Sequence, residues 1–150
     1  MVNLGDLLGE QAKVLAQKSI EIGNVYRINL DRKSGIEPKP GDETRNKFFI
    51  ILGFDSEGNL YGGVIINSAI NVNIPPRLKI LHMPLKADKY NFLDYDSFVD
   101  CSSLITTPLD GFSRWKYLGK IDPDDVRLIV GTLKTSPRVD PDRLEDFGIR

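Results

Sequence analysis

The feature that most constrains the fold is the segment Gly41–Ser68, in which two apolar stretches are separated by a turn. Phe48–Leu52 is apolar without alternation, which is typical of a strand buried on both faces. Asp55–Asn59 follows as a hairpin turn, in which Gly58 supplies a positive φ. Leu60–Ile66 then predicts a second strand that pairs with the first. The rest of the chain is interpreted as the barrel that holds this hairpin.

The hairpin is expected to bring Arg45 and Ser68 to the same end of the sheet, although they are far apart in the chain. A guanidinium offers paired donors to phosphate oxygens, and a neighbouring hydroxyl can hold a further oxygen. We therefore predict a site for phosphate chemistry at this rim. The alternative is a structural Arg45 that pairs with Asp42 or Glu43 and pins the preceding loop.

Short strand-like segments precede and follow the hairpin, and helices are predicted near both ends of the chain. Asp122–Leu133 has the clearest helix signals, with Asp122 as N-cap, Pro123 at the first helical position and an apolar stripe behind them. Leu4–Ile20 predicts a further helix. The other strands are predicted at Gly23–Leu30, Leu78–Met83, Ser97–Thr107 and Arg114–Leu118. This order predicts a mainly β (α+β) fold, a small antiparallel barrel with a C-terminal helix and an N-terminal helical extension.

The length of 150 residues suits a single domain. We divide it into a helical extension at residues 1–21, a barrel at residues 22–135 and a tail at residues 136–150. The tail is rich in proline and charge, which predicts mobility, although Leu144 and Phe147 could dock. The N-terminal helix is expected either to cover the barrel or to pack on a partner subunit.

Basic residues are concentrated in and after the long loop Asp31–Thr44, where glycines and prolines forbid regular structure. Lys33, Lys39 and Lys47 are candidates for guiding a phosphate backbone, with plain solvated side chains as the alternative. The single histidine, His82, is a candidate base, although a lone histidine on a predicted strand is more often structural.

Composition excludes several classes of function. The formal net charge is −1, so nucleic-acid binding needs a local basic patch. One cysteine excludes an internal disulfide, and together with one histidine it argues against a zinc site, so no metal or cofactor is expected. No apolar run approaches the roughly 20 residues of a membrane span. The N-terminus lacks a signal-peptide pattern. We expect a cytoplasmic protein without membrane contact.

Five short sequence segments follow one another within residues 23–135 and together form a pattern. They are Gly23–Leu30, Thr44-Arg45 with Phe48–Leu52, Ile66-Asn67-Ser68, Phe98–Cys101 with Leu104-Ile105, and Leu118–Ile121 before the capped helix. In this order they resemble the PemK/MazF-like toxins of toxin–antitoxin systems. The family equivalents are an opening G-D-hydrophobic strand, an Arg-Pro-apolar strand, an "I-T-S" strand end, a D-Q-hydrophobic strand and a G-x-hydrophobic ending.

The resemblance implies an SH3-like barrel that forms a homodimer, cuts single-stranded RNA without a metal and is blocked by a cognate antitoxin. The family's catalytic arginine falls on Arg45. Its threonine falls on Asn67 or Ser68, depending on one gap, and Ser68 keeps the hydroxyl. Two family residues differ here: Asn46-Lys47 replaces the proline after the arginine, and Cys101 replaces the glutamine after the acid.

RNA carries its own nucleophile, the 2′-OH. An enzyme must orient it, take its proton, neutralise the phosphorane and protonate the leaving 5′-oxygen. Arg45 suits charge stabilisation, Ser68 would hold a phosphate oxygen or the 2′-OH, and Glu43 is the candidate base with His82 as second choice. The candidate substrate contacts are Lys33, Lys39, Lys47, Asn67 and His82.

Two other hypotheses use the same barrel. One is a catalytically inactive module that binds a protein or peptide, which the departure at Asn67 and the near-neutral charge favour. The other is a gyrase poison similar to CcdB. Incubation with single-stranded RNA in EDTA separates the nuclease from the binding module. Growth arrest with intact transcripts and damaged DNA would indicate the gyrase poison.

Overall fold

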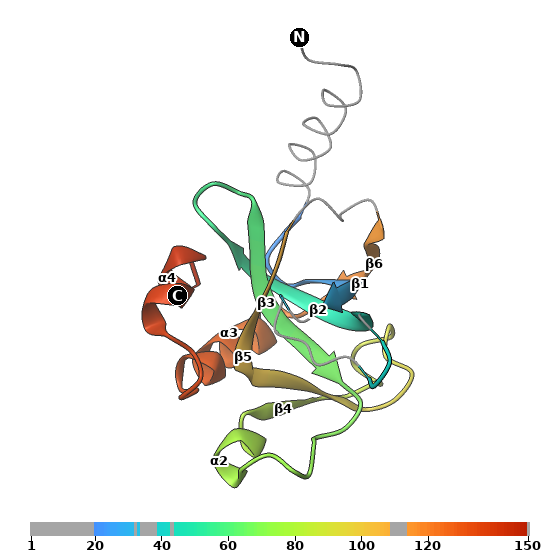
Figure 1. The fold of residues 1–150 in the computed structure, drawn as a ribbon. Coiled ribbons are helices and arrows are strands. Elements are labelled where there is room, and N and C mark those ends of the chain that lie inside the picture. Colours follow the sequence, from blue (N-terminus) through green and yellow to red (C-terminus); the bar gives the residue numbers. More distant parts are fainter. Residues whose placement is uncertain (1–19, 32, 34–38, 43, 109–113, 150) are drawn as a thin grey trace.

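The computed structural model describes residues 20–31, 33, 39–42, 44–108 and 114–149. These residues form a six-stranded antiparallel sheet in the order β4-β5-β3-β2-β1-β6 (Figure 1). The strands are β1 (Asn24–Asp31), β2 (Thr44–Phe54), β3 (Leu60–Asn67), β4 (His82–Leu85), β5 (Ser97–Pro108) and β6 (Lys116–Lys120). The helices are α2 (Pro76–Lys79), α3 (Pro123–Lys134) and α4 (Pro141–Asp146). The predicted mainly β, α+β class is confirmed, and β4 and β6 form the two ends of the sheet.

The predicted hairpin is formed by β2 and β3, with Phe48 opposite Ile66 and Phe49 opposite Ile65. Its turn has Gly58 at φ 70°, as the turn chemistry required. The carboxylate of Asp55 accepts the backbone N–H groups at the start of β3, which closes the turn. β2 is longer than the predicted strand, because it begins at Thr44, the last residue of the predicted loop, and continues to Phe54.

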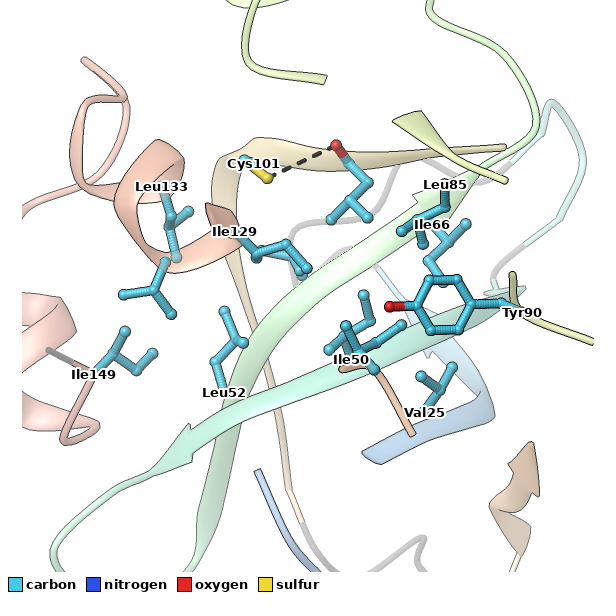
Figure 2. Packing of buried hydrophobic residues seen from close by; sticks show 14 of the residues in the cluster. Val25, Ile50, Leu52, Ile66, Leu85, Tyr90, Cys101, Ile129, Leu133 and Ile149 are labelled. Atoms are coloured by element: carbon cyan, nitrogen blue, oxygen red, sulfur yellow. Dashed lines mark hydrogen bonds between the residues drawn. The ribbon is translucent and has the colours of Figure 1, made fainter. Parts of the chain in front are cut away.

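Strand alternation gives the sheet two buried faces. On one face, Ile50 and Leu52 of β2 pack with Ile129 and Leu133 of α3, and Figure 2 shows these helical side chains directed at the sheet. On the other face, a second cluster centred on Phe49 packs with Ile20 and with the partly buried Trp115. β2 is therefore covered on both sides, as its unbroken apolar stretch predicted.

Cys101 of β5 lies in the first cluster and is fully buried. Its Sγ is 3.8 Å from the carbonyl oxygen of Val99, the contact marked by the dashed line in Figure 2. Burial raises the pKa of this thiol to about 12, because the thiolate would lose its hydration. Cys101 therefore behaves as a small apolar core residue.

The segment 136–150 differs from the mobile tail that we expected, because its described residues fold against the sheet. α4 begins after Asp140, whose carboxylate accepts the N–H of Asp142 at 2.9 Å. Leu144 and Phe147 are buried in the first cluster, as their apolar side chains allowed. Figure 1 shows α3 and α4 on the same side of the sheet.

The end of α4 docks on β2 through close backbone contact. The N–H of Phe54 donates to the carbonyl of Phe147 at 3.1 Å. A Cβ at Gly53 would lie 2.1 Å from that same carbonyl oxygen, so only glycine fits there. The C-terminal segment is thus an integral layer of the fold, which proline and charge content alone did not reveal.

The strand predicted at Leu78–Met83 is wrong. Pro76 begins the short helix α2 instead, and a strand starts only at His82. Leu78 and Leu81 are buried while Ile80 is exposed, a spacing that fits a helical turn better than alternation. Two adjacent prolines before the segment favour this helical start, because proline is accommodated at the first helical position.

The helix predicted at Asp122–Leu133 is confirmed as α3, with Asp122 at the N-cap position. The Asp122 side chain makes no capping hydrogen bond there and lies instead 3.3 Å from Lys89 Nζ. The N-terminal helix predicted at Leu4–Ile20 lies outside the described residues except for its last residue. Among the helices that the structure describes, none combines the length and apolarity needed to cross a membrane.

Candidate functional site

Arg45 and Ser68 line the same cavity, which has a volume of about 490 Å³. The hairpin register explains this proximity. Asn67 is the last residue of β3 and lies beside Lys47 of β2. Ser68 is one residue beyond Asn67, and Arg45 is two residues before Lys47, so both lie at this end of the hairpin. The structure therefore brings a guanidinium and a hydroxyl to one rim. We call this hollow the main cavity.

The main cavity also takes side chains from β4, β5 and the segment after α3. Lys47, Asn67 and His82 were predicted as site residues and line it. Four further polar residues were not predicted as site residues: Asn71, Asp100, Ser102 and Arg138. The positive side chains of Arg45, Lys47 and Arg138 outnumber the single carboxylate of Asp100, so the cavity suits an anionic ligand.

Lys47 is the most perturbed cation of the main cavity. Its Nζ donates to Oδ1 of Asn67 at 2.5 Å, which ties β2 to β3 at the rim. Partial burial, with a smaller contribution from the neighbouring Arg45 charge, lowers the pKa of Lys47 to about 8. A lysine with a pKa in this range can donate or accept a proton near neutral pH, which an ordinary surface lysine cannot.

His82 belongs to the cavity wall and is closely packed. Its Nδ1 lies 2.9 Å from the carbonyl oxygen of Leu78, and its Nε2 lies 3.5 Å from Oδ1 of Asp100. The same Asp100 oxygen accepts the hydroxyl of Ser102 at 2.5 Å. The His82 side chain is only 4% exposed, so a bound substrate has little access to it. These contacts give His82 a structural position.

Arg138 reaches the main cavity because the chain after α3 is anchored to β5. The hydroxyl of Ser136 donates to the carbonyl of Ser102 at 2.6 Å, and this bond is buried. The same hydroxyl oxygen accepts the N–H of Arg138 at 3.2 Å. Arg138 is exposed and lines the cavity, although it is distant from the hairpin in the sequence. No local sequence pattern signals this placement, because it depends on docking of the C-terminal segment.

Two of the predicted site residues that the structure describes are not brought into the main cavity. Lys33 and Lys39 are exposed and are not among its lining residues. The positive charge of Lys39 is nevertheless near enough to contribute to the lowered pKa of Lys47. Glu43, the candidate base, lies outside the described residues. Among the described acids, none pairs with Arg45, so a salt bridge from Asp42 does not account for that arginine.

The described residues contain no group of three or more His, Cys, Asp or Glu side chains arranged to hold a metal ion. No protein-family model matches the sequence, and no curated protein matches it either.

Proposed function

We propose that this chain is an endoribonuclease that cleaves single-stranded RNA by attack of a 2′-OH on the adjacent phosphate, and that it acts as a growth-inhibiting toxin of the PemK/MazF kind. The observation that carries this proposal is the presence of Arg45, Lys47 and Ser68 around one cavity. The cavity volume of about 490 Å³ lies within the range of small-ligand sites.

The charge of the main cavity favours a phosphate over a neutral ligand. Arg45, Lys47 and Arg138 concentrate positive charge there, in a chain whose net charge is −1. Guanidinium groups bind phosphate oxygens in a paired geometry, which suits Arg45 and Arg138 as contacts to a phosphodiester. Arg45 would neutralise the charge that builds up on the phosphorane.

The proposed mechanism needs one group that donates a proton to the leaving oxygen and another that takes the 2′-OH proton. Lys47, with its pKa of about 8, is mostly protonated at neutral pH and can give its proton to the departing 5′-oxygen. The hydroxyl of Ser68 is exposed and would orient the 2′-OH or a phosphate oxygen. Glu43 is kept as the proposed base that takes the 2′-OH proton. His82 is withdrawn as a candidate base, because its side chain is 4% exposed and held by Leu78 and Asp100.

The products of RNA cleavage test this proposal. The chemistry takes its nucleophile from RNA, so single-stranded RNA incubated with the purified protein in EDTA should yield 2′,3′-cyclic phosphate and 5′-hydroxyl ends. The same oligonucleotide with a deoxyribose at the cleaved position should stay intact, because it lacks the nucleophile. RNA that remains uncut under these conditions would support the binding-module hypothesis instead.

The SH3-like barrel, the homodimer and the antitoxin belong to the same proposal. The six-stranded antiparallel sheet supports a barrel-like fold, although its two end strands β4 and β6 are not paired. Expression with and without the neighbouring small open reading frame, with growth and RNA integrity followed together, tests the toxin role. Growth arrest with intact transcripts and damaged DNA would indicate a gyrase poison.

A further inference from the structure

Arg27 of β1 and Lys116 of β6 lie directly opposite each other across neighbouring antiparallel strands. Opposite residues in such a pair project from the same face, and two like charges in this position destabilise the sheet. Among the described residues, neither side chain forms an ion pair with an acid. A bound anion between them would remove this repulsion.

These two residues line a hollow of about 460 Å³, which we call the outer hollow. Arg114 supplies a third positive charge, and the described residues that line the hollow include no acid. Arg27, Arg114 and Lys116 are all exposed. The hollow therefore concentrates positive charge at the β1–β6 side of the sheet, away from the cations of the main cavity.

A third hollow connects the outer hollow to the main cavity. This middle hollow, of about 290 Å³, shares Arg45, Lys47, Asn67 and Ser68 with the main cavity. It shares Arg27 and Asn46 with the outer hollow. Tyr95, which is 60% exposed, also lines it. The three hollows thus adjoin one another through shared lining residues, and together they mark a path across β3, β2 and β1.

We propose that the outer hollow is a second RNA subsite, which binds the phosphates of nucleotides that flank the cleaved position. Arg27, Arg114 and Lys116 hold this flanking backbone, while Tyr95 offers an aromatic face to a base in the middle hollow. The inference rests on the proposed function, since it extends the same RNA strand from the main cavity.

A single strand fits this path better than a small separate anion. β2 and β6 are two strand spacings apart in the sheet, which is about 10 Å, so the two groups of cations are spread along the path instead of gathering at one point. A polymer with a regularly repeated negative charge satisfies both groups at once. Asn29 Nδ2 donates to Asn46 Oδ1 at 3.0 Å, which joins β1 to β2 beside this path and holds its floor in place.

Binding of an uncleavable strand tests the inference. The probe is a fluorescent single-stranded oligonucleotide with 2′-O-methyl groups throughout, titrated at several salt concentrations. Lys116→Ala and Arg114→Ala should each weaken binding and reduce the slope of log K against log salt by about 0.7, the value for one lost phosphate contact on a single strand. Lys134→Ala removes one exposed charge from the end of α3 and should leave both quantities unchanged.

Steady-state cleavage of the matching RNA gives a second readout. Lys116→Ala should raise KM and leave kcat unchanged, because a flanking contact binds ground state and transition state alike. If the probe binds, RNA is cut, and the Lys116 and Arg114 variants behave as Lys134→Ala does, the outer hollow is not a subsite. If binding depends on Lys116 but RNA is never cut, the subsite stands and the nuclease proposal fails. Absence of any binding overturns both.

Discussion

Nζ of Lys47 lies 2.5 Å from Oδ1 of Asn67, so one hydrogen bond joins β2 to β3 at the rim of the main cavity. The amide oxygen of Asn67 is therefore already occupied by the ammonium group of Lys47. Ser68, the next residue, is exposed and lines the same cavity. Of the two residues on which the family threonine could fall, Ser68 is therefore the one proposed to contact substrate, and Asn67 the one proposed to position Lys47.

Arg45→Ala should reduce kcat for RNA cleavage by about 10²–10³, because it removes one preorganised donor to the phosphorane. Arg45→Lys should recover part of the rate, since it restores charge without the paired geometry. Initial rates on a fluorogenic RNA measure both effects, with thermal unfolding as the control for folding. An Arg45→Ala protein that is folded and cleaves at the normal rate would remove Arg45 from the mechanism.

The pH–rate profile should fall on the alkaline side of about pH 8, where Lys47 loses the proton that it is proposed to donate. Lys47→Arg keeps the positive charge but cannot lose its proton in this range, so its residual activity should lack that limb. Single-turnover rates across the range provide the measurement. An identical alkaline limb in the Lys47→Arg protein would show that another group causes it.

Lys47 should also leave a signature in the pH dependence of stability. Its pKa is lowered from 10.5 to about 8 in the folded protein, so between these values the unfolded chain binds more protons and this contribution to stability rises with pH. Below about pH 8 the cost of burying the charge is present in full. The gain in unfolding free energy from Lys47→Met should thus be largest there and shrink as pH rises towards 10.5, as followed by urea unfolding.

Ser136→Ala should destabilise the fold by about 1–3 kcal/mol, because the buried Ser102 carbonyl loses the hydroxyl that bonds to it. It should also weaken RNA binding, since the same hydroxyl oxygen accepts the N–H of Arg138. Thr135→Ala is the matched control, because that exposed hydroxyl bonds only to the adjoining Thr132 carbonyl. Equal effects of the two substitutions would argue against an anchoring role for Ser136.

Phe147→Ala should cost about 3–5 kcal/mol, the range for removing a buried aromatic ring. The ring is buried in the first cluster, and its carbonyl accepts the N–H of Phe54. Gly53→Ala should also destabilise strongly, because its Cβ would collide with that carbonyl at 2.1 Å. Urea unfolding measures both. A loss below about 1 kcal/mol for Phe147→Ala would show that the docked segment contributes little.

The elements that could be predicted from the sequence are those specified by neighbouring residues. The β2–β3 hairpin follows from one apolar run and a Gly58 turn, and α3 follows from Pro123 and its apolar stripe. The strand prediction at Leu78–Met83 failed because apolar residues spaced by two and by three overlap in so short a segment.

The site was predictable only where the hairpin creates it. Arg45 and Ser68 could be placed together because one turn sets the register between them. Asp100 and Arg138 come from β5 and from the segment after α3, so their arrival depends on tertiary packing that no local pattern encodes. The lowered pKa of Lys47 likewise depends on burial, which the printed sequence does not show.

Because Cys101 is buried, its rate of chemical modification measures how often the core opens. It is the single thiol in the chain and has no exposed surface, and the raised pKa keeps it from forming a reactive thiolate. An alkylating reagent can modify it only in molecules in which the first cluster has opened. Pulsed alkylation followed by mass spectrometry would therefore report how often that opening occurs, without any engineered label.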